Sequence, residues 1–517
     1  MDIRAAYCIT FIASFCMLVI EVVAGRILAP FVGVSLYTWT SIIGVVLAGI
    51  SIGAFLGGKT ADSRPDTRTL GWLLLASGIA TLSIAPVTAL VASYGFKTSL
   101  MVRIVIVTTL TFFVPSLILG MISPVVVKLA LKNVETAGNV VGRIYAVSTL
   151  GSIIGTFTAG FYLISRFGTR NIIMGTGAAL IMTALGSGFL FRSKKPALAT
   201  MLFPVFLLWA LHGYAFKPPL TPDTIYYTES DYYTIKVKNS TGADSRTPLR
   251  SLVLDNLIHS YVNTDNPLHV EYRYEKVYAD VLTWRFGRDA AFRSLTIGAG
   301  GYTFPRFMEV FYPQAQLDVV EIDPEVTRIS YEHLGLPRST RIRSFNEDGR
   351  WFVMNSTARY DVVFFDAYND LSVPYHLTTR EFAKMVKDRL NPGGIVMTNI
   401  IDNFQGGSFL PSYLKTLREV FGKDNVHLIA ISPVFEKIRI STFVVLASTG
   451  SINISDFAAF MKKSRGEEAD SAVVPEAIVE GLLDRNYSVV LTDDYAPVDN
   501  LIAPVFEARF GYNRRNR

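Results

Sequence analysis

The first 216 residues consist of long apolar runs, and this feature limits the fold more than any other part of the 517-residue sequence. Each run approaches the ~20 residues that an α-helix needs to cross a bilayer. Seven such runs lie at residues 5–23, 37–56, 70–91, 100–119, 144–164, 172–191 and 197–215. We therefore predict an α-helical polytopic membrane domain over residues 1–216 with about seven spans. Six or eight spans remain open, because residues 119–131 continue the fourth run past Pro124 and could form a re-entrant turn.

Composition excludes several classes of protein. A hydrophobic fraction of 50% is too high for an ordinary soluble enzyme. Both cysteines, Cys8 and Cys16, lie in the first apolar run, so neither a disulfide framework nor a cysteine-based metal site is expected. No His/Asp/Glu spacing suggests a metal, and aromatic residues are not interleaved with basic ones as in nucleic-acid binders. Basic loops beside anionic membrane lipid account for the net charge of +6 without a nucleic-acid partner.

Residues 294–325 read as a strand, a glycine turn, a helix, a second strand and an acidic end. The first strand, residues 294–297, is apolar enough to be a buried parallel strand. The turn contains Gly298, Gly300 and Gly301, and the acidic end contains Glu321 and Asp323. A carboxylate at that place can take two ribose hydroxyls, and a separation of about 20 residues is typical of a nucleotide-binding βαβ unit. We expect a nucleoside pocket there.

The pattern changes after residue 216. Residues 217–224, KPPLTPDT, predict a stiff linker, and residues 226–238 and 249–254 predict a hairpin or small antiparallel sheet. The linker and small β-domain thus occupy residues 217–255. From residue 294 onward strands and helices alternate, which favours a mainly parallel sheet with helices on both faces. We assign this α/β domain to residues 256–517.

Seven motifs follow one another in the second half of the chain. They are LVLDNLIHSYVNTDNP, YRYEKVYADVL, LTIGAGGYTFPRFMEV, DVVEIDPEV, NEDGRWF, YDVVFFDAYND and LNPGGIVMTN. Over residues 226–447 this order resembles the spermidine synthases and related aminopropyltransferases. The resemblance implies a small N-terminal β-domain and a Rossmann-like, methyltransferase-type domain. The apolar region and the tail LTDDYAPVDNL resemble the bacterial branch in which such a domain follows a multi-span transmembrane region.

The resemblance also implies roles for single residues. Glu321 is similar to the ribose-binding acid of the family. Asp348, followed by Gly349 in NEDGR, matches the acid that receives the adenine amino group, although Asp348 could instead cap a helix that starts at Gly349. Asp366 directly follows an apolar strand, where the family places its catalytic carboxylate. Such a group could deprotonate or orient an incoming amine and stabilise a cationic centre.

Two departures separate this chain from the usual aminopropyltransferase pattern. Gly301 stands where the family's GGGDG has the aspartate that holds the ammonium of decarboxylated S-adenosylmethionine. Asn369, followed by Asp370, stands where a second aspartate is usual. Loss of carboxylates weakens selection for a purely cationic side chain, so intact S-adenosylmethionine becomes a credible ligand. Plant putrescine N-methyltransferases, which resemble this family, also lack the glycine-loop aspartate.

Further candidates for substrate binding surround the same crevice. They are His259, Tyr261, Tyr272, Tyr274, Tyr368, Tyr375 and His376. Each is alternatively a packing or surface residue. Asp493 and Asp494 form a carboxylate pair that could restore the missing negative charge or could belong to a turn before Pro497.

We predict a membrane-bound transferase that uses S-adenosylmethionine or its decarboxylated form as substrate and needs no metal. A nucleophile attacks the alkyl side chain of the sulfonium, and methylthioadenosine leaves. The nucleophile is a small-molecule amine, or a group of the same side chain that closes a ring without a second substrate. The alternatives are an S-adenosylmethionine-dependent N-methyltransferase and a transporter whose nucleoside-sensing domain has lost its chemistry. The family's frequent dimers imply a homodimer.

Basic residues in the loops give the orientation. They cluster after the second, fourth and sixth apolar runs, which by the positive-inside rule places those loops and the N-terminus in the cytoplasm. Seven crossings would then leave the C-terminal domain outside, whereas six or eight would place it inside. A domain built for a cytosolic nucleoside belongs inside. We therefore expect a multi-pass protein of the inner (cytoplasmic) membrane with a cytoplasmic catalytic domain.

Overall fold

The computed structural model describes residues 1–187, 220–465 and 471–510, except residues 34, 95, 97, 256, 369–372, 433 and 439. The chain forms two compact units. The first comprises Met1–Thr221 and Thr228–Thr234, and the second comprises Pro222–Tyr227 and Ile235–Arg517. The domain boundary predicted at residue 216 lies outside the described residues.

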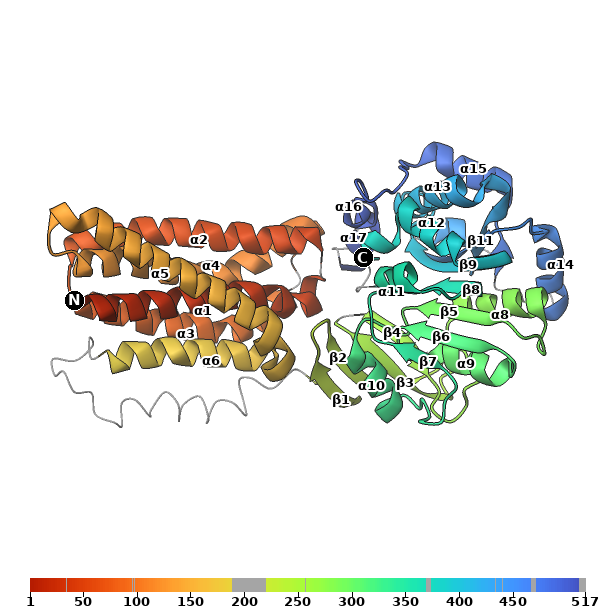
Figure 1. The fold of residues 1–517 in the computed structure, drawn as a ribbon, viewed down its shortest axis with the longest axis horizontal. Coiled ribbons are helices and arrows are strands. Elements are labelled where there is room, and N and C mark those ends of the chain that lie inside the picture. Colours follow the sequence, from red (N-terminus) through yellow and green to blue (C-terminus); the bar gives the residue numbers. More distant parts are fainter. Residues whose placement is uncertain are drawn as a thin grey trace. The chain divides into compact units, whose positions relative to one another are not determined.

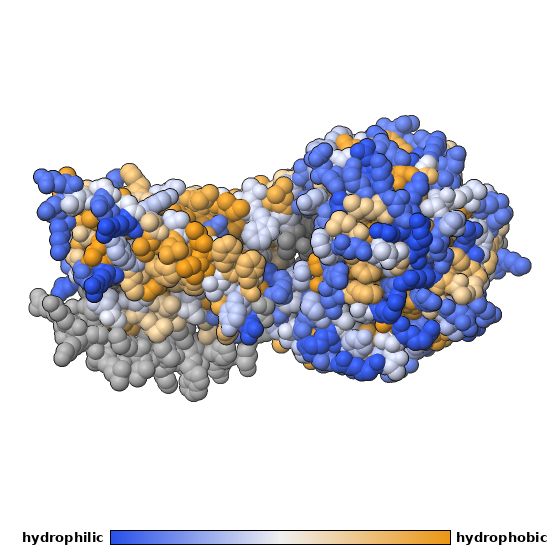
Figure 2. All heavy atoms as spheres, viewed as in Figure 1, coloured by the Kyte–Doolittle hydropathy of each residue, from blue (hydrophilic) through white to orange (hydrophobic). Residues whose placement is uncertain are grey.

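The first unit is built of long helices that lie side by side (Figure 1). They are α1 (Ile3–Val32), α2 (Leu36–Ser63), α3 (Thr67–Ser93), α4 (Leu100–Ala130), α5 (Ala137–Thr158) and α6 (Ile164–Gly186), with η1 (Val134–Thr136) before α5 and the π-helical turn η2 (Ala159–Leu163) after it. Large apolar side chains such as Phe55, Leu90 and Phe161 are exposed on this unit. Figure 2 shows hydrophobic residues gathered over the helices. Helices that are apolar on their exposed faces suit a lipid surrounding.

Five helical segments of the described residues are long and apolar enough to cross a membrane. They are Ile3–Val32, Leu36–Ser63, Thr67–Val91, Met101–Ala130 and Val134–Leu163. Residues 172–186 of the sixth predicted run belong to α6, which is not among these five segments, and residues 188–191 of that run lie outside the described residues. The seventh predicted run, residues 197–215, lies outside the described residues.

The fourth predicted run does not turn back at Pro124. Helix α4 continues unbroken through both Pro115 and Pro124 to Ala130, so the re-entrant alternative is wrong. A proline removes one backbone hydrogen bond from a helix. Membrane helices tolerate this loss, because neighbouring helices and local adjustments satisfy the freed carbonyl.

Small residues bring α2 and α4 into close contact. Gly49, Gly53 and Gly57 recur every four residues along one face of α2. A Cβ atom added at Gly53 would lie 2.1 Å from the carbonyl oxygen of Leu117 on α4. This spacing is the small-xxx-small pattern that lets helix backbones approach in membranes.

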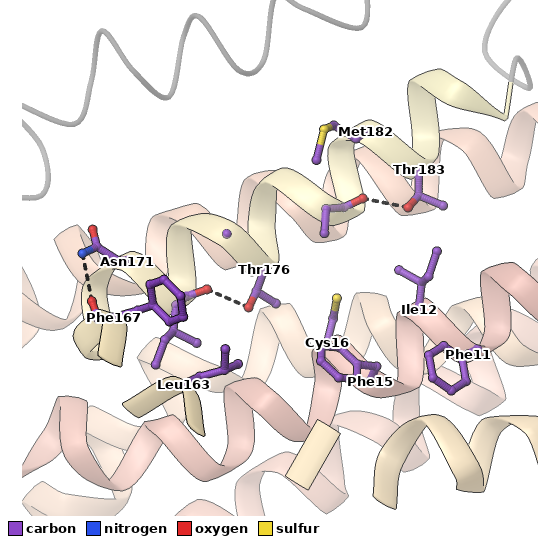
Figure 3. A pocket seen from close by; sticks show the side chains of 13 residues that line it. Phe11, Ile12, Phe15, Cys16, Leu163, Phe167, Asn171, Thr176, Met182 and Thr183 are labelled. Atoms are coloured by element: carbon purple, nitrogen blue, oxygen red, sulfur yellow. Dashed lines mark hydrogen bonds between the residues drawn. The ribbon is translucent and has the colours of Figure 1, made fainter. Parts of the chain in front are cut away.

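A cavity of about 720 Å³ lies in the first unit between α1 and α6. Figure 3 shows Phe11, Phe15 and Cys16 of α1 facing side chains of α6. The Thr176 and Thr183 hydroxyls on its wall donate to carbonyl oxygens one turn earlier in α6, at 2.7 Å each. Because these polar groups are satisfied within the helix, the wall is effectively apolar.

A four-stranded sheet in the order β1-β2-β3-β4 follows, and all of it except Thr228–Glu229 of β1 and Thr234 of β2 belongs to the second unit. Its strands are β1 (Thr224–Glu229), β2 (Thr234–Thr241), β3 (Pro248–Leu254) and β4 (Leu257–Val262). The predicted small β-domain ends at residue 255, but β4 extends the sheet to Val262. Asp255 makes the turn between β3 and β4 with a left-handed φ of 52°. Because this turn is so short, the sequence pattern does not show where β3 ends and β4 begins.

The larger sheet has the order β12-β10-β11-β9-β8-β5-β6-β7. Its strands are β5 (Arg293–Ile297), β6 (Gln316–Val320), β7 (Arg343–Phe345), β8 (Tyr360–Phe365), β9 (Leu390–Asp402), β10 (Val426–Ala430), β11 (Ser441–Ser448) and β12 (Ala472–Val473). The strands from β7 to β9 are parallel, and β11, β10 and β12 add antiparallel pairs. The predicted mainly parallel sheet is therefore confirmed.

Helices cover both faces of this sheet (Figure 1). They are α8 (Arg273–Phe286), α9 (Thr303–Phe311), α10 (Pro324–His333), α11 (Gly349–Asn355), α12 (Arg380–Asp388), α13 (Phe409–Phe421), α14 (Ile454–Arg465), α15 (Glu476–Arg485), α16 (Val498–Leu501) and α17 (Ala503–Phe510). In β8, Phe364 belongs to the core cluster that includes Tyr278 of α8, whereas Phe365 packs on Phe382 of α12. Successive strand residues point to opposite faces, so α8 and α12 lie on opposite sides of the sheet.

The strand order reverses between β5 and β8. From β5 the chain proceeds outward to β6 and β7, then returns to β8 on the other side of β5. In open α/β sheets, ligands bind at the carboxyl ends of the strands where the order reverses. We therefore expect the ligand site at the residues that follow Ile297 and Phe365.

Candidate active site

The glycine turn after β5 lies against the end of β8. Gly298 has φ +88°, and a Cβ atom there would lie 2.5 Å from the carbonyl oxygen of Asp366. Only glycine fits this close approach. The N–H of Gly301 donates to Ser260 Oγ of β4 at 2.7 Å. A Cβ at Gly301 would lie 2.9 Å from atoms of both Ser260 and Val262, so β4 leaves no room for the family's aspartate.

Glu321 directly follows β6 and turns back to the glycine loop. Its Oε2 accepts from the N–H of Ala299 at 3.0 Å, and its Oε1 accepts from the N–H of Asp323 at 3.1 Å. Burial raises the pKa of Glu321 to about 7, and these hydrogen bonds oppose the rise. The Asp323 side chain caps α10 by accepting from the N–H of Glu325 at 2.9 Å. Glu321 therefore lies at the glycine turn, whereas the Asp323 side chain caps α10.

Asp348 is a helix cap, the alternative to adenine binding that the sequence leaves open. Its Oδ1 caps α11, accepting from the N–H groups of Arg350 and Trp351 at 2.9 and 3.0 Å. Its Oδ2 lies 2.8 Å from His376 Nε2, and this hydrogen bond is the main cause that lowers the pKa of Asp348. Gly349 is buried, and a Cβ there would lie 2.5 Å from the Ile297 side chain at the end of β5. Gly349 thus lies against the end of β5, directly before the glycine turn.

Asp366 follows β8 and receives hydrogen bonds on both carboxylate oxygens. The Tyr274 hydroxyl donates to Oδ2 at 2.7 Å, and Asn399 Nδ2 donates to Oδ1 at 3.0 Å. Burial raises the pKa of Asp366, while these two hydrogen bonds lower it. The carboxyl group is fixed in position and retains lone pairs that can accept a further proton or hydrogen bond.

A cavity of about 510 Å³ opens beside Asp366. Its wall includes several predicted substrate residues, namely His259, Tyr261, Tyr272, Tyr274 and Tyr368. The rings of Tyr272 and Tyr274 stack with their centroids 5.5 Å apart. Burial lowers the pKa of His259 to about 4, so its imidazole is neutral near pH 7.

Other predicted residues lie elsewhere. Tyr375 is 58% exposed and is absent from the cavity wall, and its neighbour His376 bonds to Asp348. Asn369 and Asp370 lie outside the described residues.

The predicted acidic pair in the tail is not at the cavity. Arg350 binds both carboxylate oxygens of Asp493 at 2.7 and 2.5 Å, and Thr379 Oγ1 donates to Asp493 Oδ1 at 2.7 Å. Asp494 is exposed. Asp493 therefore ties the tail to the start of α11 and α12, and the neighbouring Asp494 faces solvent.

Two functional candidates were missed by the sequence analysis. Glu275, next to Tyr274 on α8, is only 5% exposed, and its Oε2 has no hydrogen-bond partner among the described residues. Burial, and next the charge of Asp366, raise the pKa of Glu275 well above its usual value. Asn399 of β9 orients Asp366 and presents an Oδ1 that likewise lacks a partner within the described chain. Helical spacing could have revealed Glu275, because it shares a helix face with the apolar Tyr278 and Leu282.

The comparisons with known proteins agree with this geometry. Residues 300–450 match the family model of the spermine/spermidine synthase domain. The chain is 32% identical over 216 residues to a probable polyamine aminopropyl transferase of Bifidobacterium longum, a match that covers 42% of this chain and 45% of the relative. The chain thus spans less than half the length of that relative.

A second relative reaches further along the chain. Polyamine aminopropyltransferase 2 of Aquifex aeolicus is 23% identical over 431 residues, covering 79% of this chain and 81% of its own. This match is longer than the second unit, so it includes part of the helical unit. The crystal structure of a probable spermidine synthase from Corynebacterium glutamicum aligns with 53% of this chain and 99% of its own at 20% identity, with a TM-score of 0.42. Residues 300–450 are therefore a spermine/spermidine synthase domain, and the chain that carries it is homologous to the polyamine aminopropyltransferases.

Proposed function

We propose that the second unit transfers the aminopropyl group of decarboxylated S-adenosylmethionine to an amine and releases methylthioadenosine. The hydrogen-bonded group Tyr274–Asp366–Asn399 carries this proposal. It fixes a carboxylate at the head of a cavity and beside the glycine turn, where a reacting carbon can meet an amine. The names of the relatives, polyamine aminopropyltransferases, support the same reaction class.

The transfer requires one bond to form and one to break. The amine nitrogen attacks the methylene carbon bonded to the sulfonium, and the carbon–sulfur bond breaks with its electron pair remaining on sulfur. The sulfonium thereby becomes the neutral thioether of methylthioadenosine. Asp366 accepts the proton that the amine loses, and its raised pKa brings its basicity closer to the operating pH.

The nucleoside half of the donor has two acids to bind it. Glu321 is proposed to accept the ribose hydroxyls, because its carboxylate is held at the end of β6 by the N–H of Ala299. Asp348 is proposed to accept the adenine amino group at Oδ2, since Oδ1 is occupied by the helix cap. A carboxylate oxygen has two lone pairs, so Oδ2 can bind adenine as well as His376.

The Asp366 carboxyl group favours the decarboxylated donor. It lies at the proposed reacting centre, and its charged form repels an additional α-carboxylate. A protonated amino group without that carboxylate meets no such repulsion.

Product analysis tests the proposal. Purified full-length protein in detergent is incubated with an amine mixture and either donor, and nucleosides are separated by mass. Methylthioadenosine formed from the decarboxylated donor supports the proposal. One alternative to aminopropyl transfer is methyl transfer from intact S-adenosylmethionine, and it is favoured by the glycine at position 301, where an aspartate is usual. S-adenosylhomocysteine without methylthioadenosine would replace the proposal with that alternative.

A further inference from the structure

The cavity beside Asp366 extends along the edge of the sheet away from the carboxylate. Asn399 and Ile401 on its wall come from β9, Ile440 and Thr442 lie at the start of β11, and Ile431 directly follows β10. Those strands are successive neighbours in the order β8, β9, β11, β10. At the usual spacing of ~4.8 Å between strands, the wall reaches roughly 14 Å from β8.

The part of the wall away from Asp366 is apolar. Its contributions from the sheet are Ile401, Ile431, Ile440 and Thr442, and β4 adds Leu257 and Ile258. The part of a substrate that lies along this wall is removed from water. A charged group buried there without a partner would cost several kcal/mol.

The wall contains two acids, Asp366 and Glu271, and they differ in their hydrogen-bond partners. Glu271 Oε2 lies 2.9 Å from His269 Nε2, and its Oε1 accepts from the N–H of Ala243 at 2.7 Å. Arg273 adds a positive charge to the same wall. Asp366 accepts instead from a hydroxyl and an amide, so of the two acids on the described wall it is the one without a basic hydrogen-bond partner and the one that we pair with the ammonium group.

The tyrosines present rings rather than free hydroxyls. The hydroxyl of Tyr272 donates to the carbonyl of Ile258 at 2.8 Å, that of Tyr368 to the carbonyl of Asn399 at 2.7 Å, and that of Tyr274 to Asp366. The Tyr261 ring meets the Tyr272 ring edge to face at a centroid distance of 5.5 Å. Together these rings form an aromatic wall beside the attack site.

We propose that the acceptor is a primary amine with a single charged group and an apolar, aliphatic or aromatic body that lies along the isoleucine wall. This inference rests on the proposed aminopropyl transfer and names its acceptor class. The ammonium is held at Asp366, where it loses its proton, and the apolar body fills the cavity. A diamine of equal length would place its second ammonium among Ile401, Ile440 and Ile431.

A matched pair of amines tests the inference. n-Hexylamine and 1,5-diaminopentane have the same chain length, but the diamine replaces the terminal methyl group with an ammonium. Full-length protein and the decarboxylated donor are incubated with each amine, and kcat/KM is measured from methylthioadenosine and the mass of the alkylated product. We expect hexylamine, and phenethylamine as an aromatic member, to exceed the diamine at least about tenfold. Equal or higher kcat/KM for the diamine would overturn the inference.

Two variants make the test specific to the wall. Ile431→Asp, or Ile440→Asp if the first variant does not fold, places a carboxylate on the distant wall and should raise the diamine-to-hexylamine ratio at least about tenfold. Val434→Asp is the matched control, because Val434 is 51% exposed and absent from the cavity wall, and the ratio should not change. A folded wall variant with an unchanged ratio would also overturn the inference. Failure of the proposed function would be distinguishable from failure of this inference. In that case neither the monoamines nor the diamine would yield methylthioadenosine.

Discussion

In the proposed transfer, the chemistry of the second unit depends on Asp366. Replacing it with asparagine removes the proton acceptor but keeps the size of the side chain. We expect Asp366→Asn to lower the rate of methylthioadenosine release by 100-fold or more, since a positioned general base contributes about 10²–10⁴. Binding of methylthioadenosine, measured by calorimetry, should persist because Glu321 and Asp348 are unchanged.

The same variant separates an enzyme from a sensor. If the second unit only senses a nucleoside for a transporting helical unit, Asp366→Asn leaves all measurable activity as it was. Thermal unfolding of the variant provides the control for folding. A rate equal to that of the unchanged protein, with the nucleoside still bound, would contradict our assignment of Asp366 as the base.

The pH dependence follows from the environment of Asp366. Burial raises its pKa, so the carboxylate becomes protonated, and the base is lost, at a higher pH than for an exposed aspartate with pKa ~3.9. The hydrogen bond from Tyr274 lowers that pKa because it stabilises the charged form. In Tyr274→Phe the acid limb of kcat/KM should therefore move to higher pH.

Tyr272→Phe is the matched control for this profile. It removes a neighbouring hydroxyl that donates to the Ile258 carbonyl and not to Asp366. The position of its acid limb should equal that of the unchanged protein. A Tyr274→Phe limb at the same or lower pH would show that the hydroxyl does not stabilise the carboxylate.

Single residues were predictable where their position follows from a strand end. Glu321 and Asp366 each directly follow an apolar strand, and the structure places both beside the glycine turn. The partners of Asp366 were not predictable, because the Tyr274 contact joins residues 92 positions apart. The pairing of Asp493 with Arg350 spans 143 positions, so the sequence could not distinguish an ion pair from a substrate carboxylate.

At the scale of elements, the close packing of α2 on α4 can be tested with alanine. A Cβ at Gly53 would meet the Leu117 carbonyl oxygen at 2.1 Å, so the helices must separate. Overpacking of this kind typically costs about 1–3 kcal/mol. We expect Gly53→Ala to lower the Tm of the detergent-solubilised protein by several degrees, measured by the fluorescence of unfolding.

Gly58 on the same helix provides the control. A Cβ there would meet no atom within 4 Å, and alanine has the higher helix propensity. Gly58→Ala should leave the Tm unchanged or raise it slightly. Equal losses of Tm in both variants would mean that close contact with α4 does not determine the effect.

Elements were predictable where the pattern is local and long. The alternation of strands and helices after residue 294 is realised in the sheet from β5 to β11, because each strand is a short apolar segment bounded by turns. The small β-domain was predicted as a hairpin or small antiparallel sheet that ends at residue 255. It is a sheet of four strands, and β4 was missed because the turn at Asp255 is too short to separate two runs. The continuity of α4 through two prolines depends on packing with its neighbours, which sequence periodicity does not report.

At the scale of the whole molecule, composition separates the helical unit from the α/β unit. The relative from Aquifex aeolicus matches this chain over part of both units, so the combination is not peculiar to this chain. The number of crossings decides on which side of a membrane the synthase domain lies. Five described segments are apolar enough to span, and residues 188–219 lie outside the described part, so the sidedness must be measured.

We expect the full-length protein to remain in the membrane fraction after an alkaline carbonate wash, with its C-terminus in the cytoplasm. A domain built for a cytosolic nucleoside belongs inside, and the basic loops place the N-terminus there as well, which requires an even number of crossings. A C-terminal tag should be cleaved by protease added to inverted inner-membrane vesicles and protected in intact spheroplasts. A periplasmic loop tag of known sidedness provides the control. Protection in the inverted vesicles would mean an odd number of crossings, and the proposed donor could then reach Asp366 only after export.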